Sequence, residues 1–289
     1  MLLLLALLQQ IDSTVPVERG QRLEINTYAG EIAVKTWNRN AVRVVADPDR
    51  RAVIEIDRSA TQVSVRTQRQ RGGPSMVDLQ VTAPAWMALD LSGVYTDVSI
   101  AGARGPISVE TVQGEVDVEG GDGLVSLQSV QGSVSLRGAK GSIEVHSVNE
   151  DVGVSASSGE VTAETVNGDV TLSRVDGSGV TATSVNGDLD YDGPIRDGGR
   201  YAFSTHNGDI TLTVAEGTNA SVAVSTFNGE FASAFPVTLT ETRKGKRFSF
   251  RLGSGSAQVT LESFQGTIEL VRPGASRGAR ERNHDDDPE

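Results

Sequence analysis

The sequence reads Thr165-Val-Asn-Gly-Asp-Val170 near its middle, and this six-residue phrase returns along much of the chain. The phrase consists of Thr or Ser, an apolar residue, Asn or Gln, Gly, Asp or Glu, and Val, Ile or Leu. Its Asn/Gln positions are 113, 131, 149, 167, 186, 207, 228 and 265, which gives steps of 18, 18, 18, 19, 21, 21 and 37 residues. The last step is interpreted as two periods with one unmarked repeat between them. A fixed period near 20 residues predicts a repeat architecture.

The residues around the phrase predict two short strands joined by a corner. Val161, Ala163 and Thr165 share one face of a strand, and Val170 and Leu172 share one face of the next. The alternation changes parity after Thr165, which a strand cannot do without a corner or a bulge. Asn-Gly marks the corner, because both residues tolerate positive φ. The corner residues predicted in this way are Asn167, Gly168, Asn186, Gly187, Asn207, Gly208, Asn228 and Gly229.

These repeats predict an all-β protein, namely a right-handed β-helix or β-solenoid of about 18–21-residue repeats with irregular β caps at both ends. Coils of this kind stack about 4.8 Å apart, so that each strand lies beside its own counterpart. The interior is narrow, and an aromatic content of 4% agrees with a core of small residues such as Val and Ala. Stacked Asn and Gln side chains are expected to form an amide ladder. The alternative is a sandwich or propeller built from Asn-Gly hairpins.

Composition divides the chain into five segments. Residues 1–11 begin with an apolar run that resembles a signal peptide shortened at its start. Residues 12–91 alternate apolar and polar residues and are predicted to form an N-terminal β region or cap, followed by the regular solenoid repeats of 92–233. Residues 234–272 are predicted to form a C-terminal cap, in which Phe235, Phe248, Phe250 and Phe264 cover the open end of the stack. Residues 273–289 contain no apolar residue beyond Ala and are expected to be disordered.

The charge of the chain limits its partners. The formal net charge is −12, and residues 92–233 hold 6 Lys and Arg against 20 Asp and Glu, a net of −14. Such a surface repels nucleic acid and anionic lipid and attracts cations or basic partners, so no nucleic-acid partner is expected. The absence of cysteine excludes disulfides and thiolate metal sites. No transmembrane segment is expected, because a span needs about 20 apolar residues.

Six acidic residues follow the corner and are the candidate metal ligands. They are Glu115, Asp151, Asp169, Asp188, Asp209 and Glu230. In stacked coils they would form a column of mutually repelling carboxylates, which bound Ca²⁺ could relieve. The phrase differs from the nonapeptide Ca²⁺-binding repeat, so a solvated acidic edge is favoured over a weak Ca²⁺ site. No other cofactor is expected.

No catalytic residue can be nominated. Carbohydrate-active β-helix enzymes need paired carboxylates at a fixed separation. Here the acids recur periodically, and the three histidines (146, 206 and 284) are scattered, with His206 in the apolar place of the phrase. The chain is therefore predicted not to be an enzyme.

The sequence resembles a widespread bacterial family of β-strand-repeat proteins that are labelled adhesins and are otherwise uncharacterised. The resemblance lies in the Val-x-Gly-Asp-Val repeats, in Gly199-Arg-Tyr-Ala-Phe-Ser-Thr-His-Asn-Gly-Asp209 and in Glu262-Ser-Phe-Gln-Gly-Thr-Ile268, and covers residues 12–272. Members commonly carry Ser where this chain has Asn or Gln, and Glu150 replaces the Gly of one repeat. The resemblance implies export and a right-handed β-helix-like stack, and it brings no catalytic residues.

Three functions follow as hypotheses. The first is a non-enzymatic, exported protein of the bacterial envelope, adhesin-like or a scaffold, that is monomeric and binds a surface or envelope ligand, protein or polysaccharide. Such a protein would be periplasmic, displayed on the cell surface or secreted. The second is a self-assembling filament like the bactofilins, in which coils stack end to end. The third is a carbohydrate-active β-helix enzyme.

Overall fold

The computed structural model describes residues 11–48, 52–69, 76–237, 240–242 and 246–274. These residues form strands and turns without a helix, and the strands join in one 26-stranded sheet. The all-β prediction is confirmed. None of the described segments is a helix long and apolar enough to cross a membrane.

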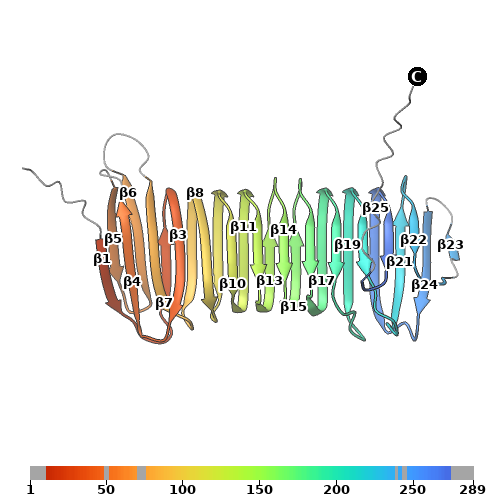
Figure 1. Ribbon diagram of the computed structural model, residues 1–289, viewed down its shortest axis with the longest axis horizontal. Helices are drawn as coiled ribbons and strands as arrows, with labels where there is room; N and C mark the ends of the chain where they lie inside the picture. Colours follow the sequence, from red (N-terminus) through yellow and green to blue (C-terminus); the bar gives the residue numbers. More distant parts are fainter. Residues whose placement is uncertain (1–10, 49–51, 70–75, 238–239, 243–245, 275–289) are drawn as a thin grey trace, which may run out of the picture.

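The strands form two ladders that run the length of the molecule (Figure 1). In spatial order, the first ladder contains β5 (Ala52–Arg58), β6 (Gln62–Arg69), β2 (Arg22–Asn26), the start of β8 (Ala88–Ala103), β9 (Ile107–Gln113), β11 (Asp122–Gln131), β13 (Lys140–His146), β15 (Ser158–Glu164), β17 (Asp176–Asn186), β19 (Arg200–Asn207), β25 (Ala257–Gln265), β21 (Ala220–Thr226), β24 (Lys246–Leu252) and β23 (Thr240–Thr242).

The second ladder contains the shorter strands that follow each corner. In spatial order, these are β1 (Ile11–Pro16), β4 (Ala41–Pro48), β7 (Val77–Pro84), β3 (Ala29–Trp37), the end of β8, β10 (Val116–Gly120), β12 (Val134–Arg137), β14 (Val152–Ser155), β16 (Val170–Ser173), β18 (Leu189–Asp192), β20 (Ile210–Thr213), β26 (Ile268–Val271) and β22 (Phe231–Ser233).

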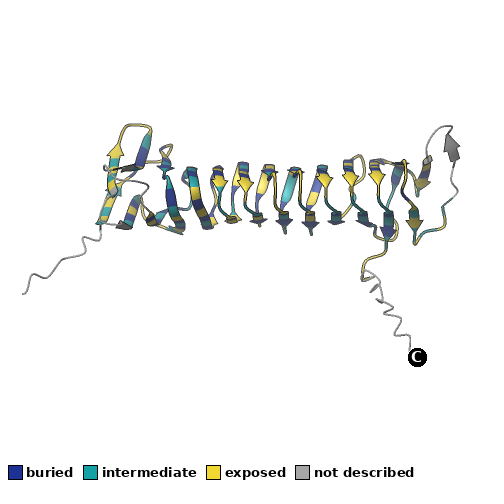
Figure 2. Ribbon diagram, turned by 90° about the horizontal axis from the view of Figure 1, so that it is seen from above, coloured by how far each residue is buried: buried dark blue, intermediate teal, exposed yellow. Residues whose placement is uncertain are grey.

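Like residues stack on like residues in both ladders. Val134 lies opposite Val152, and Val152 lies opposite Val170, in parallel register. Figure 2 looks down the strands and shows the two ladders as two layers, with buried and exposed residues along the strands of each. The inward residues of one coil, such as Val161, Ala163 and Leu172, are at most 2% exposed. The result is a long parallel stack, as predicted for a solenoid.

At one place the interior holds aromatic side chains, in contrast to the core of small residues predicted from the sequence. Tyr191, Tyr201 and Phe203 are all buried there, and their ring centroids lie 5.2 to 6.0 Å apart. The loop of residues 193–199 lies beside these rings, since Pro194 and Arg196 bond the tyrosine hydroxyls, and it adds Ile195 to the edge of the core. The prediction of a core of small residues such as Val and Ala is therefore wrong for these two neighbouring coils.

Both ends of the stack depart from chain order. The last coil, β25 and β26, lies between the coil of β19 and β20 and the coil of β21 and β22. Figure 1 shows β25 in darker blue between β19 and β21. At the other end, the first coil, β2 and β3, lies between β8 and the coil of β6 and β7. We call these two coils the inserted coils.

The insertion corrects two interpretations of the sequence. The described residues of the 37-residue step form no unmarked coil, because residues 246–252 pair antiparallel with β21 and the chain then turns back into the stack. The parallel stack also extends beyond residues 92–233, since β2, β3 and β25 belong to it. Residues 257–271, predicted as part of the C-terminal cap, lie inside the stack with a coil on either side.

Antiparallel strands close the two ends. β1, β4 and β5 do so at the N-terminal end and β24 and β23 at the C-terminal end. Phe248 and Phe250 are buried against Phe231, whereas Phe264 is 39% exposed and covers nothing at the end. The predicted signal peptide lies outside the described residues except for Ile11, which begins β1, and residues 275–289 of the predicted tail also lie outside them.

Candidate functional site

The corner of each coil is the most regular polar feature of the molecule, and its glycine is required by a close approach. A β-carbon built on Gly187 would lie 1.8 Å from the carbonyl oxygen of Gly168 in the preceding coil, and one on Gly208 would lie 2.0 Å from that of Gly187. Among the corner glycines, only Gly114 and Gly266 have positive φ. The positive φ predicted for Gly168, Gly187, Gly208 and Gly229 is therefore wrong, and the neighbouring backbone is the reason for glycine there.

The Thr or Ser of the phrase points into the core, and its hydroxyl donates a hydrogen bond to the carbonyl oxygen of the corner residue in the preceding coil. Ser184 Oγ donates to Gly168 O at 2.9 Å, and Thr205 Oγ1 donates to Gly187 O at 2.9 Å. Thr165 bonds Glu150 O at 2.9 Å, so the residue that replaces glycine in the phrase still supplies the acceptor. Each of these hydroxyls is buried. At these corners the hydroxyls link each coil to the one before it, whereas Thr226 accepts the backbone N–H of Gly229 at 3.0 Å.

The predicted amide ladder is present in two runs. Asn167 Nδ2 donates to Asn149 Oδ1 at 3.1 Å, and Asn186 and Asn207 continue the run at 2.8 Å for each step. Gln113 and Gln131 form the other run. Between the runs, Asn149 donates to the backbone oxygen of Val130 instead. The ladder pairs amides across coils and lies on the exposed edge.

The acidic column is shorter than the sequence suggested. Asp151, Asp169, Asp188 and Asp209 lie on successive coils, since the residues that follow them pair directly. Ser133 lies between Glu115 and Asp151 in the stack, and Thr267 of the inserted coil lies between Asp209 and Glu230. Of the six candidate acids, four therefore form a continuous column, and Glu115 and Glu230 are separated from it.

Each aspartate in the column has a structural partner. Asp169 Oδ1 accepts the backbone N–H of Asp188 at 2.7 Å, and Asp188 Oδ1 accepts that of Asp209 at 2.8 Å. Such charge-assisted bonds are among the stronger hydrogen bonds in proteins. Within the part of the chain that the structure describes, no three acidic or histidine residues form a group that could hold a metal ion.

An exposed apolar column runs beside the amides, and the sequence analysis missed it. It holds the second residue of each phrase: in stack order, Val112, Val130, Val148, Val166, Val185, His206, Phe264 and Phe227. The valines are 37–46% exposed. The signal was available, because Thr165 points inward and its neighbour Val166 must therefore point outward.

Three rings end this column. The His206 and Phe264 rings are stacked with centroids 4.6 Å apart and planes 7° apart, and Phe264 and Phe227 follow at 4.9 Å and 4°. Phe227 is 61% exposed. We call His206, Phe264 and Phe227 the ring stack.

A groove of about 680 Å³ runs beside the ring stack. Its floor is a row of outward side chains from neighbouring strands of the first ladder, in the order Thr183, Ser204, Glu262, Ser225 and Arg247. Arg247 Nε donates to Ser225 Oγ at 3.3 Å. The groove thus joins an aromatic wall to a floor of hydroxyls and two opposite charges.

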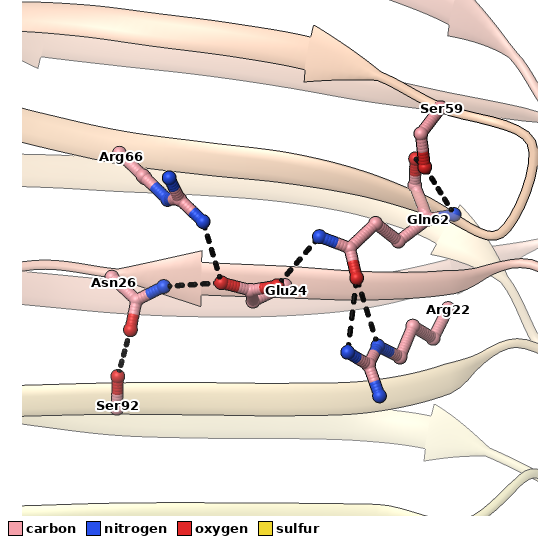
Figure 3. Close-up of polar contacts among 7 residues, drawn as sticks. All are labelled: Arg22, Glu24, Asn26, Ser59, Gln62, Arg66 and Ser92. Carbon is pink, nitrogen blue, oxygen red and sulfur yellow. Dashed lines mark hydrogen bonds and ion pairs between the residues drawn. The ribbon is translucent and has the colours of Figure 1, made fainter.

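The most connected carboxylate belongs to Glu24, at the N-terminal inserted coil (Figure 3). It accepts hydrogen bonds from Asn26 at 2.9 Å, Gln62 at 2.8 Å and Arg66 at 3.2 Å. The hydrogen bond from Arg66, above all, holds the pKa of Glu24 below its ordinary value. With these donors around it, Glu24 is a brace between β2 and β6, and Asn26 extends the network to Ser92 of β8.

The buried tyrosines are structural as well. Tyr201 donates to Gly177 O at 2.6 Å and accepts the backbone N–H of Arg196 at 2.7 Å. Arg196 also makes a bidentate ion pair with Asp176. Burial raises the pKa of both Tyr191 and Tyr201, so these phenols stay protonated. They anchor the 193–199 loop and have no geometry for proton transfer to a ligand.

The histidines remain apart. His146 Nδ1 lies 3.4 Å from a Glu164 carboxylate oxygen on the next coil, His206 belongs to the ring stack, and His284 lies outside the described residues. The described residues therefore bring together an apolar column, a ring stack and a groove, and no cluster with the layout of a nucleophile and base.

Comparison with known proteins finds one matching family. The sequence pattern of the Toastrack family (DUF4097) matches residues 21–271. No curated protein matches the sequence.

Three solved structures align over 91% of this chain. A candidate adhesin of Bacteroides fragilis is 11% identical with a TM-score of 0.42, and one of Parabacteroides distasonis is 9% identical with a TM-score of 0.40; 97% of each is covered. A candidate cell adhesion protein of Clostridium sporogenes is covered completely, at 8% identity and a TM-score of 0.25.

Proposed function

This chain belongs to the Toastrack family, and we propose that it is a non-enzymatic, adhesin-like binding protein exported to the bacterial envelope. In this proposal the coils form a right-handed solenoid of 18–21-residue repeats, and the ring stack with its groove forms the binding surface. The protein is periplasmic, displayed on the cell surface or secreted, and acts as a monomer.

The ring stack with its groove is the observation that carries the proposal. Exposed, contiguous apolar surface marks interaction sites in soluble proteins. Phe227 is 61% exposed and Phe264 is 39% exposed, and both line the groove. A rigid stack that presents rings at fixed spacing is suited to binding, since little order must be gained on association.

The two other functions find less support. Filament growth needs open parallel ends, and here antiparallel strands lie outside the last coils at both ends. Catalysis needs a focused polar cluster, whereas the acids that follow the corner recur at most once in a coil, and Asp169 and Asp188 accept backbone N–H groups.

Binding to isolated bacterial envelopes tests the proposal. Labelled protein is incubated with cell-wall and membrane fractions, and the bound share is measured against concentration. A triple variant of the ring stack, His206→Ser/Phe227→Ser/Phe264→Ser, should bind at least tenfold more weakly than the unchanged protein. The matched control, Val112→Ser/Val130→Ser/Val148→Ser, removes three exposed apolar side chains at the other end of the column and should bind normally.

Two results would contradict the proposal. One is equal binding by the two triple variants while both melt like the unchanged protein. The other is retention of the protein in the cytoplasm when cells that express the full chain are fractionated.

A further inference from the structure

The ring stack exists because of the C-terminal inserted coil. Phe264 of β25 lies between His206 of β19 and Phe227 of β21, although it follows both in sequence. Elsewhere in the column the same place holds valine. Rings are thus concentrated on the three adjacent coils that border the groove, and nowhere else along the column.

The rings form an inclined ladder. Carbon faces pack at about 3.5–4.0 Å, whereas these centroids lie 4.6 and 4.9 Å apart with nearly parallel planes. The rings are therefore offset, and each exposes a rim and part of a face with a shallow notch to its neighbour. Full burial of a Phe side chain contributes roughly 1.5–3 kcal/mol. A partner that fills the notches gains this apolar contact.

The floor of the groove cannot accept another strand. Its residues belong to strands that already pair on both sides, from β19 through β25 and β21. The available polar groups are side chains, chiefly the hydroxyls of Ser204 and Ser225 and the carboxylate of Glu262. The backbone of a bound ligand therefore cannot pair with the sheet. It must form its hydrogen bonds with water and with the side chains of the floor.

We propose that the groove binds a proline-rich peptide segment in the polyproline II conformation, with a Lys or Arg that reaches Glu262. This inference rests on the proposed binding function and names its ligand. Polyproline II has no internal hydrogen bonds, so its carbonyls can accept from the floor hydroxyls. Proline-rich segments dock in aromatic-lined grooves because little conformational entropy is lost.

The spacing of the coils fits this conformation. One turn of polyproline II has three residues and rises about 9.3 Å, and two coil spacings amount to about 9.6 Å. A prolyl ring in each turn therefore meets every second coil. The floor crosses five strands, or about 19 Å, which corresponds to two turns and six residues.

Other occupants fit less well. A sugar chain stacks on open ring faces, and the Phe264 ring lies between the rings of His206 and Phe227. A second copy would need about 800 Å² from each partner, whereas the apolar column is a single residue wide.

The test uses the full chain and three labelled nine-residue peptides in fluorescence anisotropy. The first has eight prolines and a central Arg, the second has Gly in place of every Pro, and the third has Glu in place of Arg. We expect the first to bind at least tenfold more tightly than the second. It should bind about threefold or more tightly than the third at low salt, and Glu262→Gln should abolish this difference.

Variants locate the site. Phe264→Ser should weaken binding of the proline peptide at least tenfold, and Phe227→Leu, which keeps an apolar side chain without a ring, should weaken it less. Val112→Ser/Val130→Ser is the matched control and should leave affinity unchanged. Circular dichroism and a thermal melt check that each variant is folded.

Several outcomes would overturn the peptide assignment. They are equal affinity for the proline and glycine peptides, unchanged affinity in folded Phe264→Ser, competition by a soluble envelope polysaccharide alone, and dimerisation that the ring variants abolish. If envelope binding still depended on the ring stack, the proposed function would stand without this ligand. If the protein bound the proline peptide but did not bind isolated envelopes, the peptide assignment would be supported and the proposed function would be wrong.

Discussion

The corner glycines have neighbours so close that a single methyl group should disturb the stack. Gly187→Ala would force the new β-carbon or the Gly168 carbonyl to move, because the two would otherwise lie 1.8 Å apart. Overpacking of this kind costs roughly 1–3 kcal/mol. We expect Gly187→Ala to lower the free energy of unfolding by more than about 1 kcal/mol, measured by urea denaturation.

Gly153 provides the control for this prediction. It lies in β14 with open space where a β-carbon would be, and its φ is not positive. Gly153→Ala should be neutral, or stabilising by up to about 1 kcal/mol through the unfolded chain. Equal losses in the two variants would show that contact with the neighbouring coil is not the reason for the corner glycine.

A second prediction at this scale separates the charge of Asp169 from its hydrogen bond. Asp169→Asn keeps an oxygen for the Asp188 N–H and removes one charge from a repelling column, so stability should stay equal or rise slightly. Asp169→Ala loses the acceptor and should cost about 1 kcal/mol. Thermal melts of both variants measure this, and a larger loss in Asp169→Asn would show that the charge itself has a role.

At the scale of the strands, the hydrogen bonds of Glu24 between β2 and β6 predict that the stability of the protein depends on pH. The folded-state pKa of Glu24 lies below its ordinary value of 4.5, so the unfolded chain binds more protons as the pH falls. The stabilisation by Glu24 is present above pH 4.5 and is lost as the pH falls through the folded-state pKa. We expect the unchanged protein to melt above Glu24→Gln at pH 7, with the difference shrinking below pH about 4.5. A difference that is constant from pH 7 to 3 would contradict this role.

The elements also show what the sequence could and could not predict. The repeated phrase predicted the two strands of a coil, the corner and the amide ladder, since side chains such as Asn167 and Asn186 meet only if like stacks on like. The inserted coils could not be predicted, because every coil presents nearly the same alternating residues to its neighbours. Thr226 and Ser263 occupy the same place in the repeated phrase, so the sequence does not show which of them lies next to Thr205. The groove depends on this order and was missed with it.

Over the whole molecule, the acidity of the repeats predicts the response to salt. Residues 92–233 carry a net −14, and four aspartates lie on successive coils. Cations should raise the melting temperature by screening this repulsion. We expect equal shifts in CaCl₂ and NaCl at matched ionic strength. A Ca²⁺-specific shift that disappears in Asp169→Asn/Asp188→Asn would instead assign a metal site to the column.

The inserted coils have a mechanical consequence. A terminal coil of an ordinary stack can peel from its one neighbour when its end of the chain is pulled. Here a tension on the C-terminal side of Val271 reaches β26, which is bonded on one side to β20 and on the other to β22. A tension on the N-terminal side of Arg22 likewise reaches β2 between β6 and β8. β2 and β26 are each held between two neighbouring strands, and load that reaches either strand must break two sets of ladder hydrogen bonds at once before its coil is released.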